Sequence, residues 1–227
     1  MYAKCIKRVL DFILALCALI VLFPLLLVLT IVGAVKMKVN PFFTQLRPGK
    51  GEKIFKLIKF RSMTCETDAD GNLLPDEQRL TAYGKFLRGS SMDELPELLN
   101  ILIGDMSIVG PRPQLVRDMV FMTPEQRRRH SVRQGLTGLA QVSGRNALRW
   151  ERKLECDLEY IENITFLGDV KIILMTFVRV FKKEGITEDG QATATDYGDY
   201  LLSIGAVTQE EYDRKQAEAR KLLSEIG

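Results

Sequence analysis

Two adjacent acids stand ahead of an apolar stretch in the middle of the chain and are the first candidates for chemistry. Asp93 and Glu94 lie in the segment SSMDELPELLNILIGDMSIVGPRP, residues 90–113. Paired carboxylates can act as a nucleophile or a general base, and they can bind a divalent cation. Ordinary helix capping is the alternative, because Ser91 followed three residues later by Glu94 fits a capping box. This segment alone does not decide between the two.

Pro96 limits where the following helix can begin. With Ser91 as the cap, Pro96 would be the fifth helical residue, where its missing N–H and its ring disrupt the helix. A start at Asp93 puts Pro96 in the first turn, where proline is tolerated, and leaves both acids at a helix N-terminus that stabilises anions. A phosphate would be attracted to the same place. We therefore expect a helix through residue 103 with the acids at its start.

The remaining composition assigns any catalysis to carboxylates. The 227 residues carry a net charge of +3 and are enough for one domain with a buried core. His130 is the only histidine, which gives little support to a histidine-rich metal site or a serine–histidine triad. The four cysteines form no C-x-x-C pair, which fits a reducing cytosolic setting without structural zinc.

Residues 12–35 contain no charged side chain and are apolar enough to enter a membrane. As one straight helix, these 24 residues would extend ~36 Å, against ~30 Å of bilayer hydrocarbon. Basic residues flank the run on both sides, which is typical of cytoplasmic segments. Pro24, near the middle, can bend the helix. A re-entrant hairpin explains both features, and a kinked spanning helix is the alternative because membrane helices tolerate proline.

A basic segment follows the apolar run. Residues 36–61 contain eight lysines and arginines against one acid, Glu52. Such a segment favours anions or an anionic membrane surface, and a solvated basic face is the alternative.

Periodicity predicts several further elements. We expect a short strand within residues 54–63, where apolar and basic residues partly alternate. Amphipathic patterns predict helices at residues 95–103 and 150–161. The apolar segment 169–183 is either a core helix or a helix that lies in a membrane interface. A polar helix with its own capping signal begins at Thr208, and we interpret it as an appendage.

Five sequence blocks, in a fixed order, resemble the bacterial sugar transferase family, the small monotopic polyprenyl-phosphate phosphoglycosyl transferases. The blocks are FTQLRPG (43–49), KFRSM (59–63), SMDELPELLN (91–100), GDMSIVGPRP (104–113) and GLTGLAQVSGRN (135–146). Together with the apolar segment, the resemblance covers about residues 1–195. The segment GQATAT, residues 190–195, is similar to members that transfer diacetylbacillosamine phosphate at the start of protein N-glycosylation.

The resemblance implies a reaction and a set of site residues. Sugar 1-phosphate would pass from a UDP-sugar to undecaprenyl phosphate with release of UMP, through an aspartyl-phosphosugar intermediate in a ping-pong mechanism with Mg²⁺. The implied donor is a UDP-N-acetylated amino sugar such as UDP-diacetylbacillosamine. Asp93 is then the nucleophile and the Mg²⁺ ligand, and Glu94 assists as metal organiser or base. The candidates for binding phosphate or nucleotide are Lys59, Arg88, Arg112, Arg145 and Asp157. Each cation could instead form a surface salt bridge, and Asp157 could be a helix-surface acid.

The expected fold is α+β and mostly helical, in three parts. Residues 1–38 form a re-entrant membrane helix–break–helix hairpin with its break at Pro24. Residues 39–195 form a compact catalytic domain with amphipathic interfacial helices, on the cytoplasmic face of the bacterial inner membrane. Residues 196–227 form a C-terminal helical appendage that could mediate homo-oligomerisation. The expected partners are UDP-sugar, undecaprenyl phosphate and the lipid bilayer, with no nucleic acid.

Two other functions fit parts of the sequence. A membrane-anchored scaffold would use the basic segment for lipid and the final helix for a partner, without catalysis. A soluble-type metal phosphohydrolase would use Asp93 without needing a lipid.

Overall fold

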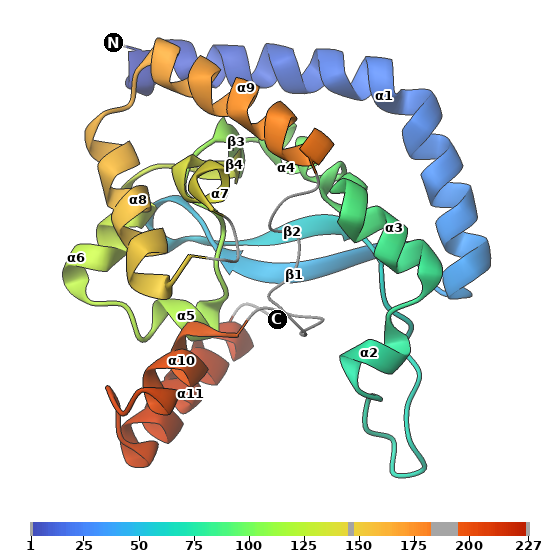
Figure 1. Ribbon diagram of the computed structural model, residues 1–227, viewed down its shortest axis with the longest axis vertical. Helices are drawn as coiled ribbons and strands as arrows, with labels where there is room; N and C mark the ends of the chain where they lie inside the picture. Colours follow the sequence, from blue (N-terminus) through green and yellow to red (C-terminus); the bar gives the residue numbers. More distant parts are fainter. Residues whose placement is uncertain (1, 145–147, 183–194, 226–227) are drawn as a thin grey trace.

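The chain folds into a mostly helical α+β structure around two small sheets, within the parts that the structure describes (Figure 1). The computed structural model describes residues 2–144, 148–182 and 195–225. The longer helices are α1 (Lys7–Met37), α3 (Ala82–Ser90), α4 (Glu97–Ile103), α8 (Trp150–Glu162), α9 (Phe166–Lys182), α10 (Tyr197–Ser203) and α11 (Gln209–Ser224). The short helices are α2 (Asp76–Arg79), α5 (Val116–Met119), α6 (Pro124–Arg127) and α7 (Leu139–Ser143). The strands are β1 (Phe42–Pro48), β2 (Ile54–Phe60), β3 (Met106–Val109) and β4 (Gln134–Thr137). Single tight turns are the π-helix η1 (Tyr2–Ile6) and the 3₁₀ helices η2 (Lys50–Glu52), η3 (Met92–Glu94) and η4 (Arg128–Ser131).

Helix α1 is continuous through Pro24, which corrects the expected helix–break–helix form. Proline has a helical φ and removes only one backbone hydrogen bond, so a helix can bend there without ending. Figure 1 shows α1 running along one side of the domain and then bending to follow a second side. Among the described residues, Tyr2–Met37 is the one helical segment long and apolar enough to cross a membrane, and an 18-residue window within it has a mean hydropathy of 3.2.

Both halves of α1 are fixed to the rest of the molecule. Near its start, Lys7 Nζ lies 2.7 Å from Asp169 Oδ2 of α9. In its second half, the carbonyl oxygen of Leu29 accepts a 2.8 Å hydrogen bond from the Tyr83 hydroxyl of α3. Ala15 and Leu29 are buried in two separate apolar clusters that also contain residues of β2. The helix therefore lies along the domain instead of projecting from it.

Strands β1 and β2 form an antiparallel hairpin at the centre of the domain (Figure 1). Phe42 pairs with Phe60 at one end, and Pro48 pairs with Ile54 at the other. Phe55 and Leu57 alternate along β2 and face the core, which is the period-2 pattern of a half-buried strand. The strand expected within residues 54–63 is confirmed at Ile54–Phe60.

Strands β3 and β4 form a parallel pair whose ends require glycine. Gly110 N donates a 2.9 Å hydrogen bond to Thr137 O, and Gly135 N donates a 2.8 Å bond to Pro111 O. A Cβ on Gly135 would lie 2.1 Å from Gly110 N, so only glycine permits this approach. These two backbone hydrogen bonds fix the start of the loop after β3, which contains Arg112.

The expected helices are confirmed with small shifts of their ends. Patterns at residues 95–103, 150–161 and 169–183 correspond to α4, α8 and α9. The start expected for the helix at Asp93 is wrong, because Asp93 lies in a separate tight turn. The alternative, a capping box at Ser91, does not form either, because Ser91 is left-handed, with a φ of 56°, and ends α3. A single 3₁₀ turn follows, and the regular helix begins only at Glu97.

The C-terminal helix packs against the domain. The Thr208 hydroxyl accepts a hydrogen bond from Glu211 N, which confirms the predicted helix start. Ala219 of α11 is buried in a cluster with Val116, Met119 and Val120. The apolar side of α11 is thus used within the chain, and self-association through this helix stays a prediction.

Candidate active site

Asp93 and Glu94 occupy the 3₁₀ turn η3 between α3 and α4, and they are half-buried. Pro96 is the N-cap residue of α4. The regular helix therefore starts at this proline, three residues after Asp93, and not at Ser91. A tight turn with a left-handed residue before it holds two successive side chains at one place. The two acids are therefore presented together by backbone geometry.

Helix α4 is anchored at several points, which fixes the position of the acids. Asn100 Nδ2 donates a 2.7 Å hydrogen bond to Lys56 O, and Asn100 Oδ1 accepts a 3.0 Å bond from Ile58 N, so the helix is tied to β2. Arg8 of α1 donates bonds of 2.6 and 2.9 Å to the carbonyls of Ile101 and Leu102. These carbonyls end a helix and need external donors. Helix α1 thus helps to position the turn that contains the acids.

Two cations bind Glu94. Lys59 Nζ lies 2.9 Å from Glu94 Oε1, and Arg112 Nη2 lies 2.6 Å from the same oxygen. Lys59 Nζ also lies 3.2 Å from Glu97 Oε1, whose side chain is only 3% exposed. Lys59 comes from β2 and Arg112 from the loop after β3, so two segments distant in sequence converge on η3.

This arrangement gives the two neighbouring acids opposite properties. Burial, with the charge of Glu94, raises the pKa of Asp93 to about 6, although Lys59, Arg112 and Arg88 oppose the shift. Burial also disfavours ionisation of Glu94, but the charges and hydrogen bonds of Arg112 and Lys59 outweigh it and hold the Glu94 pKa well below its usual range. Asp93 therefore keeps a more basic carboxylate, while the charge of Glu94 is neutralised by its partners.

Glu97 and Arg47 belong to this site and were not among the predicted residues. Burial, opposed by Lys59, raises the pKa of Glu97 to about 7. Arg47 of β1 donates a 3.1 Å hydrogen bond to Pro113 O, beside Arg112, and its buried Nε has no hydrogen-bond partner in the described parts of the chain. Both residues lie inside sequence blocks that resemble the family, and this position could have marked them as site residues. Their contacts depend on tertiary structure.

The predicted phosphate ligands are brought together only in part. Lys59 and Arg112 contact Glu94. Arg88 influences the pKa of Asp93, and its Nε donates a 3.0 Å bond to the Ser62 hydroxyl. Arg145 and residues 190–194 of the GQATAT segment lie outside the described residues.

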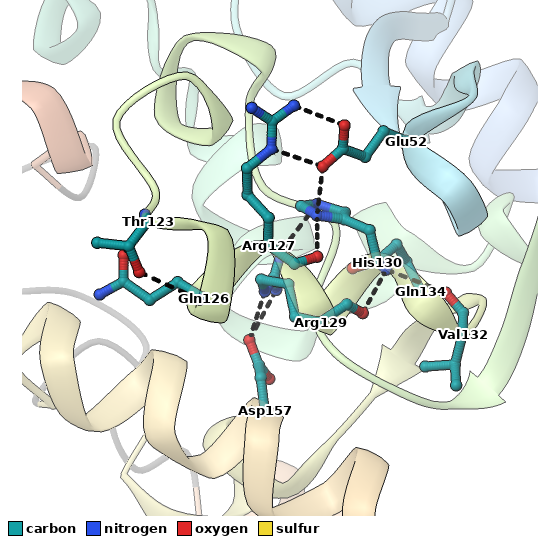
Figure 2. A network of polar contacts seen from close by, with 9 residues as sticks. All are labelled: Glu52, Thr123, Gln126, Arg127, Arg129, His130, Val132, Gln134 and Asp157. Atoms are coloured by element: carbon teal, nitrogen blue, oxygen red, sulfur yellow. Dashed lines mark hydrogen bonds and ion pairs between the residues drawn. The ribbon is translucent and has the colours of Figure 1, made fainter.

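Asp157 was also predicted to bind phosphate or nucleotide, but its side chain is buried, at 2% exposure, and pairs elsewhere. Its Oδ2 accepts bonds of 2.9 and 2.7 Å from Nε and Nη2 of Arg129, which is fully buried. Figure 2 shows this pair between α8 and η4, with the Glu52–Arg127 pair on the opposite side of η4. Arg129 Nη2 also donates a 2.6 Å bond to Arg112 O. Asp157 is thus a positioning residue that acts on Arg112 through Arg129.

Asp157→Asn is expected to lower the free energy of unfolding by ~3 kcal/mol, because it leaves the buried Arg129 charge unpaired. In a chain of this size the melting temperature should fall by roughly 6–12 °C. Glu52→Gln is the matched control, because the pair with Arg127 is one-third exposed and should be worth less than ~1 kcal/mol. Thermal unfolding of both variants checks the difference, and equal melting temperatures would contradict the buried role of Asp157.

One carboxylate of the site suits Mg²⁺. Among the described residues, no group of three or more His, Cys, Asp or Glu side chains is placed to hold a metal ion. Mg²⁺ commonly uses one or two carboxylates and takes its other ligands from substrate phosphates and water. The half-buried Asp93 fits that donor set, whereas Glu94 is already bound by Lys59 and Arg112.

Comparison with known proteins gives the family. Residues 2–183 match the family described as bacterial sugar transferase. The chain belongs to this family. The sugar transferase EpsL of Bacillus subtilis is 48% identical to this transferase over 170 residues, which cover 74% of this chain and 84% of EpsL. The UDP-glucose:undecaprenyl-phosphate glucose-1-phosphate transferase of Xanthomonas campestris is 39% identical over 186 residues, 77% of this chain and 38% of the relative. The corresponding enzyme of Klebsiella pneumoniae is 38% identical over 185 residues, 77% of this chain and 40% of the relative.

The transferase therefore spans well under half the length of the two glucose-1-phosphate transferases, and it covers most of EpsL. The matched region contains η3, Lys59 and Arg112. The comparison confirms the enzyme class expected from the sequence, a phosphoglycosyl transferase.

Proposed function

We propose that the chain transfers a sugar 1-phosphate from a UDP-sugar to undecaprenyl phosphate and releases UMP, at the cytoplasmic face of the bacterial inner membrane. The observation that carries this proposal is the pair of acids in η3, of which Glu94 is held by Lys59 and Arg112, beside a long apolar helix. Relatives named for glucose-1-phosphate transfer to undecaprenyl phosphate support the reaction.

Asp93 is the proposed nucleophile. An Oδ of Asp93 attacks the sugar-linked phosphorus of the UDP-sugar, an Asp93 O–P bond forms, and the bond from phosphorus to the bridging oxygen breaks, so UMP leaves. An oxygen of undecaprenyl phosphate then attacks the same phosphorus and breaks the Asp93 O–P bond. The product is undecaprenyl diphosphosugar, and the carboxylate is regenerated. Covalent catalysis of this kind replaces one difficult displacement with two easier ones.

The opposite pKa shifts support this division of labour. A carboxylate with a raised pKa is the stronger nucleophile, and at pH 7 Asp93, with a pKa of about 6, is mostly ionised. Glu94 is bound by two cations, which makes its carboxylate a weak nucleophile. We assign it the role of orienting Lys59 and Arg112 toward the substrate phosphates. Bound Mg²⁺, held by Asp93 and the phosphates, would supply further neutralisation of charge.

The position of α1 supports a re-entrant arrangement in the membrane. A straight helix across ~30 Å of hydrocarbon would carry one end away from the catalytic domain. Here both halves contact that domain, through Lys7 and Leu29. Large apolar side chains are exposed on α1 and α9, including Val21 and Leu167, as expected of a surface in contact with lipid. Cysteines placed at residues 2 and 38 should both react from the cytoplasmic side, and reaction from opposite sides would contradict the re-entrant arrangement.

The donor is proposed to be a UDP-N-acetylated amino sugar such as UDP-diacetylbacillosamine. Purified protein with undecaprenyl phosphate, Mg²⁺ and a panel of UDP-sugars should release UMP, most rapidly with this class. Release of UMP with UDP-glucose alone would overturn the donor assignment. No release with any donor would favour the scaffold function, and free sugar phosphate formed without lipid would favour the phosphohydrolase.

Activity is expected to fall about tenfold per pH unit below about pH 6, because only ionised Asp93 attacks and its pKa is raised to about 6. Glu94→Gln should move this acid limb to lower pH, because removing the Glu94 charge removes one cause of the raised pKa. The pH dependence of kcat/KM checks the shift. Glu52→Gln should leave the limb in place, and an unchanged limb in Glu94→Gln would contradict the assignment to Asp93.

A further inference from the structure

An apolar cavity of about 340 Å³ lies between α1, the β1–β2 hairpin and α4. Five of its lining residues come from α1, including Phe23 and Leu27, and the opposite wall contains Phe60, Pro96 and Leu99. Thr30 is the one polar residue among them, and its hydroxyl already donates to Leu26 O. The cavity has the size of a small-ligand site, and its walls offer contacts to hydrocarbon and few to a sugar or nucleotide.

Residues that line the cavity are close in sequence to residues of the candidate active site. Phe60 directly follows Lys59, and Pro96 is the third residue after Asp93. Three residues reach at most about 11 Å, so the cavity wall at Pro96 lies within that distance of the Asp93 backbone. The turn η3 and helix α4 therefore face two environments. Glu94 and Glu97 contact Lys59, while Pro96 and Leu99 line the cavity.

We propose that this cavity binds the first isoprene units of the polyprenyl phosphate acceptor. The inference rests on the proposed function and names a site for the acceptor's hydrocarbon. The acceptor is the substrate that joins an anion to a long apolar chain, and the molecule offers cations next to an apolar cavity at the level of its membrane helix. A phosphate near Lys59 and Arg112 would leave the attached isoprenoid next to Pro96. The UDP-sugar has no apolar part to place there.

Filling the cavity should weaken acceptor binding selectively. Leu27→Trp and Leu99→Trp each put a large side chain at a lining position. The apparent KM for undecaprenyl phosphate should rise at least about tenfold, since excluding even two methylene groups from an apolar site has that effect. The KM for the UDP-sugar should change less than about twofold, because the donor does not enter the cavity.

Neighbouring positions provide matched controls. Val28 is adjacent to Leu27 on α1 and similarly exposed, at 55% against 49%, and it does not line the cavity. Ile103 is one turn after Leu99 on α4 and also lies outside the lining. Val28→Trp and Ile103→Trp should keep the acceptor KM of the unmodified enzyme. An unchanged KM in Leu27→Trp and Leu99→Trp, or an equal rise in the controls, would overturn the proposal.

A binding measurement separates this inference from the reaction itself. A polyprenyl phosphate with a photoreactive diazirine in its first isoprene units is cross-linked to the full-length protein without any donor. Labelled peptides should come from α1 and α4, and Leu27→Trp should reduce the labelling at least about fivefold while Val28→Trp does not. This result would support the acceptor site even if no UDP-sugar gave turnover, in which case only the proposed reaction fails. Labelling that is spread over the exposed face of α9, or that is unchanged in Leu27→Trp, would show a general contact with lipid and would contradict the site.

Discussion

Asp93→Asn is expected to lower UMP release on the order of 1,000-fold or more, because asparagine has no anionic oxygen to attack phosphorus. The change is nearly isosteric, and Glu94 keeps its bonds to Lys59 and Arg112, so the fold should survive. Steady-state UMP release with the preferred donor gives the activity. Direct titration of the donor should show binding within about tenfold of the unmodified enzyme, since the phosphate-binding cations remain.

Two variants make this result specific. Asp105→Asn changes the acid at the other end of α4, outside the group around Lys59, and should retain activity within about twofold. Glu94→Gln removes a charge that orients the cations but leaves the nucleophile, so it should lose less activity than Asp93→Asn. Activity of Asp93→Asn above a few per cent would contradict Asp93 as the nucleophile. A larger loss in Glu94→Gln would indicate that Glu94 is the nucleophile instead.

Lys59→Met is expected to reduce both stability and activity. Lys59 is the shared partner of Glu94 and Glu97, and its side chain is 18% exposed. Breaking a largely buried ion pair from one side costs ~3–5 kcal/mol, which corresponds to a fall of roughly 6–20 °C in melting temperature for a chain of this size. UMP release should fall at least about 100-fold, because a positive charge beside the transferred phosphate is lost.

The pH dependence of this loss follows from the carboxylates. Without Lys59, Glu97 loses its cation, while Glu94 keeps only Arg112. Protonation of Glu97 then removes the repulsion between the two carboxylates. The pKa of Glu97 is already raised to about 7 in the intact site, so the stability difference should shrink as pH falls from 8 to 5. Thermal unfolding across this pH range measures it.

The control is an ion pair at the surface. Arg152 and Glu159 lie 2.6 Å apart and are each about half exposed, so Arg152→Met should leave the melting temperature nearly unchanged. If Lys59→Met were as stable as Arg152→Met at pH 8, the network around η3 would not be the buried cluster described above.

The sequence predicted the longer elements of the fold because their patterns extend over many residues. The helices α8 and α9 begin and end within a few residues of the expected positions, α11 begins where its capping signal placed it, and β2 lies within its predicted range. Strands β3 and β4 have four residues each, which is too short for a periodic signal. Their pairing also depends on glycines that meet only after the chain has folded.

The path of α1 depends on contacts that are distant in sequence. Pro24 and the basic flanks predicted a disruption of the helix, whereas α1 bends along its length and stays a continuous helix through Pro24. Contacts to Asp169 and Tyr83, more than 50 residues away in sequence, hold both halves of α1 on the domain. No pattern within residues 12–35 contains those contacts.

For the site, the sequence identified the groups that meet and missed those that position them. Asp93, Glu94, Lys59 and Arg112 were predicted from their places in ordered blocks. Glu97 was not among the predicted residues, and Asp157 was placed among the phosphate ligands although it pairs with Arg129 in the interior. Such roles depend on which buried charges face one another, and spacing in sequence does not encode that.

The covalent intermediate is tested most directly by the intact mass of the protein after incubation with the UDP-sugar and Mg²⁺ alone. We predict a mass increase equal to one sugar phosphate, one equivalent of UMP, and a fragment spectrum that places the adduct on Asp93. Undecaprenyl phosphate added afterwards should remove the adduct. Formation of UMP only when both substrates are present, with no adduct at any time, would contradict an aspartyl intermediate and indicate direct displacement.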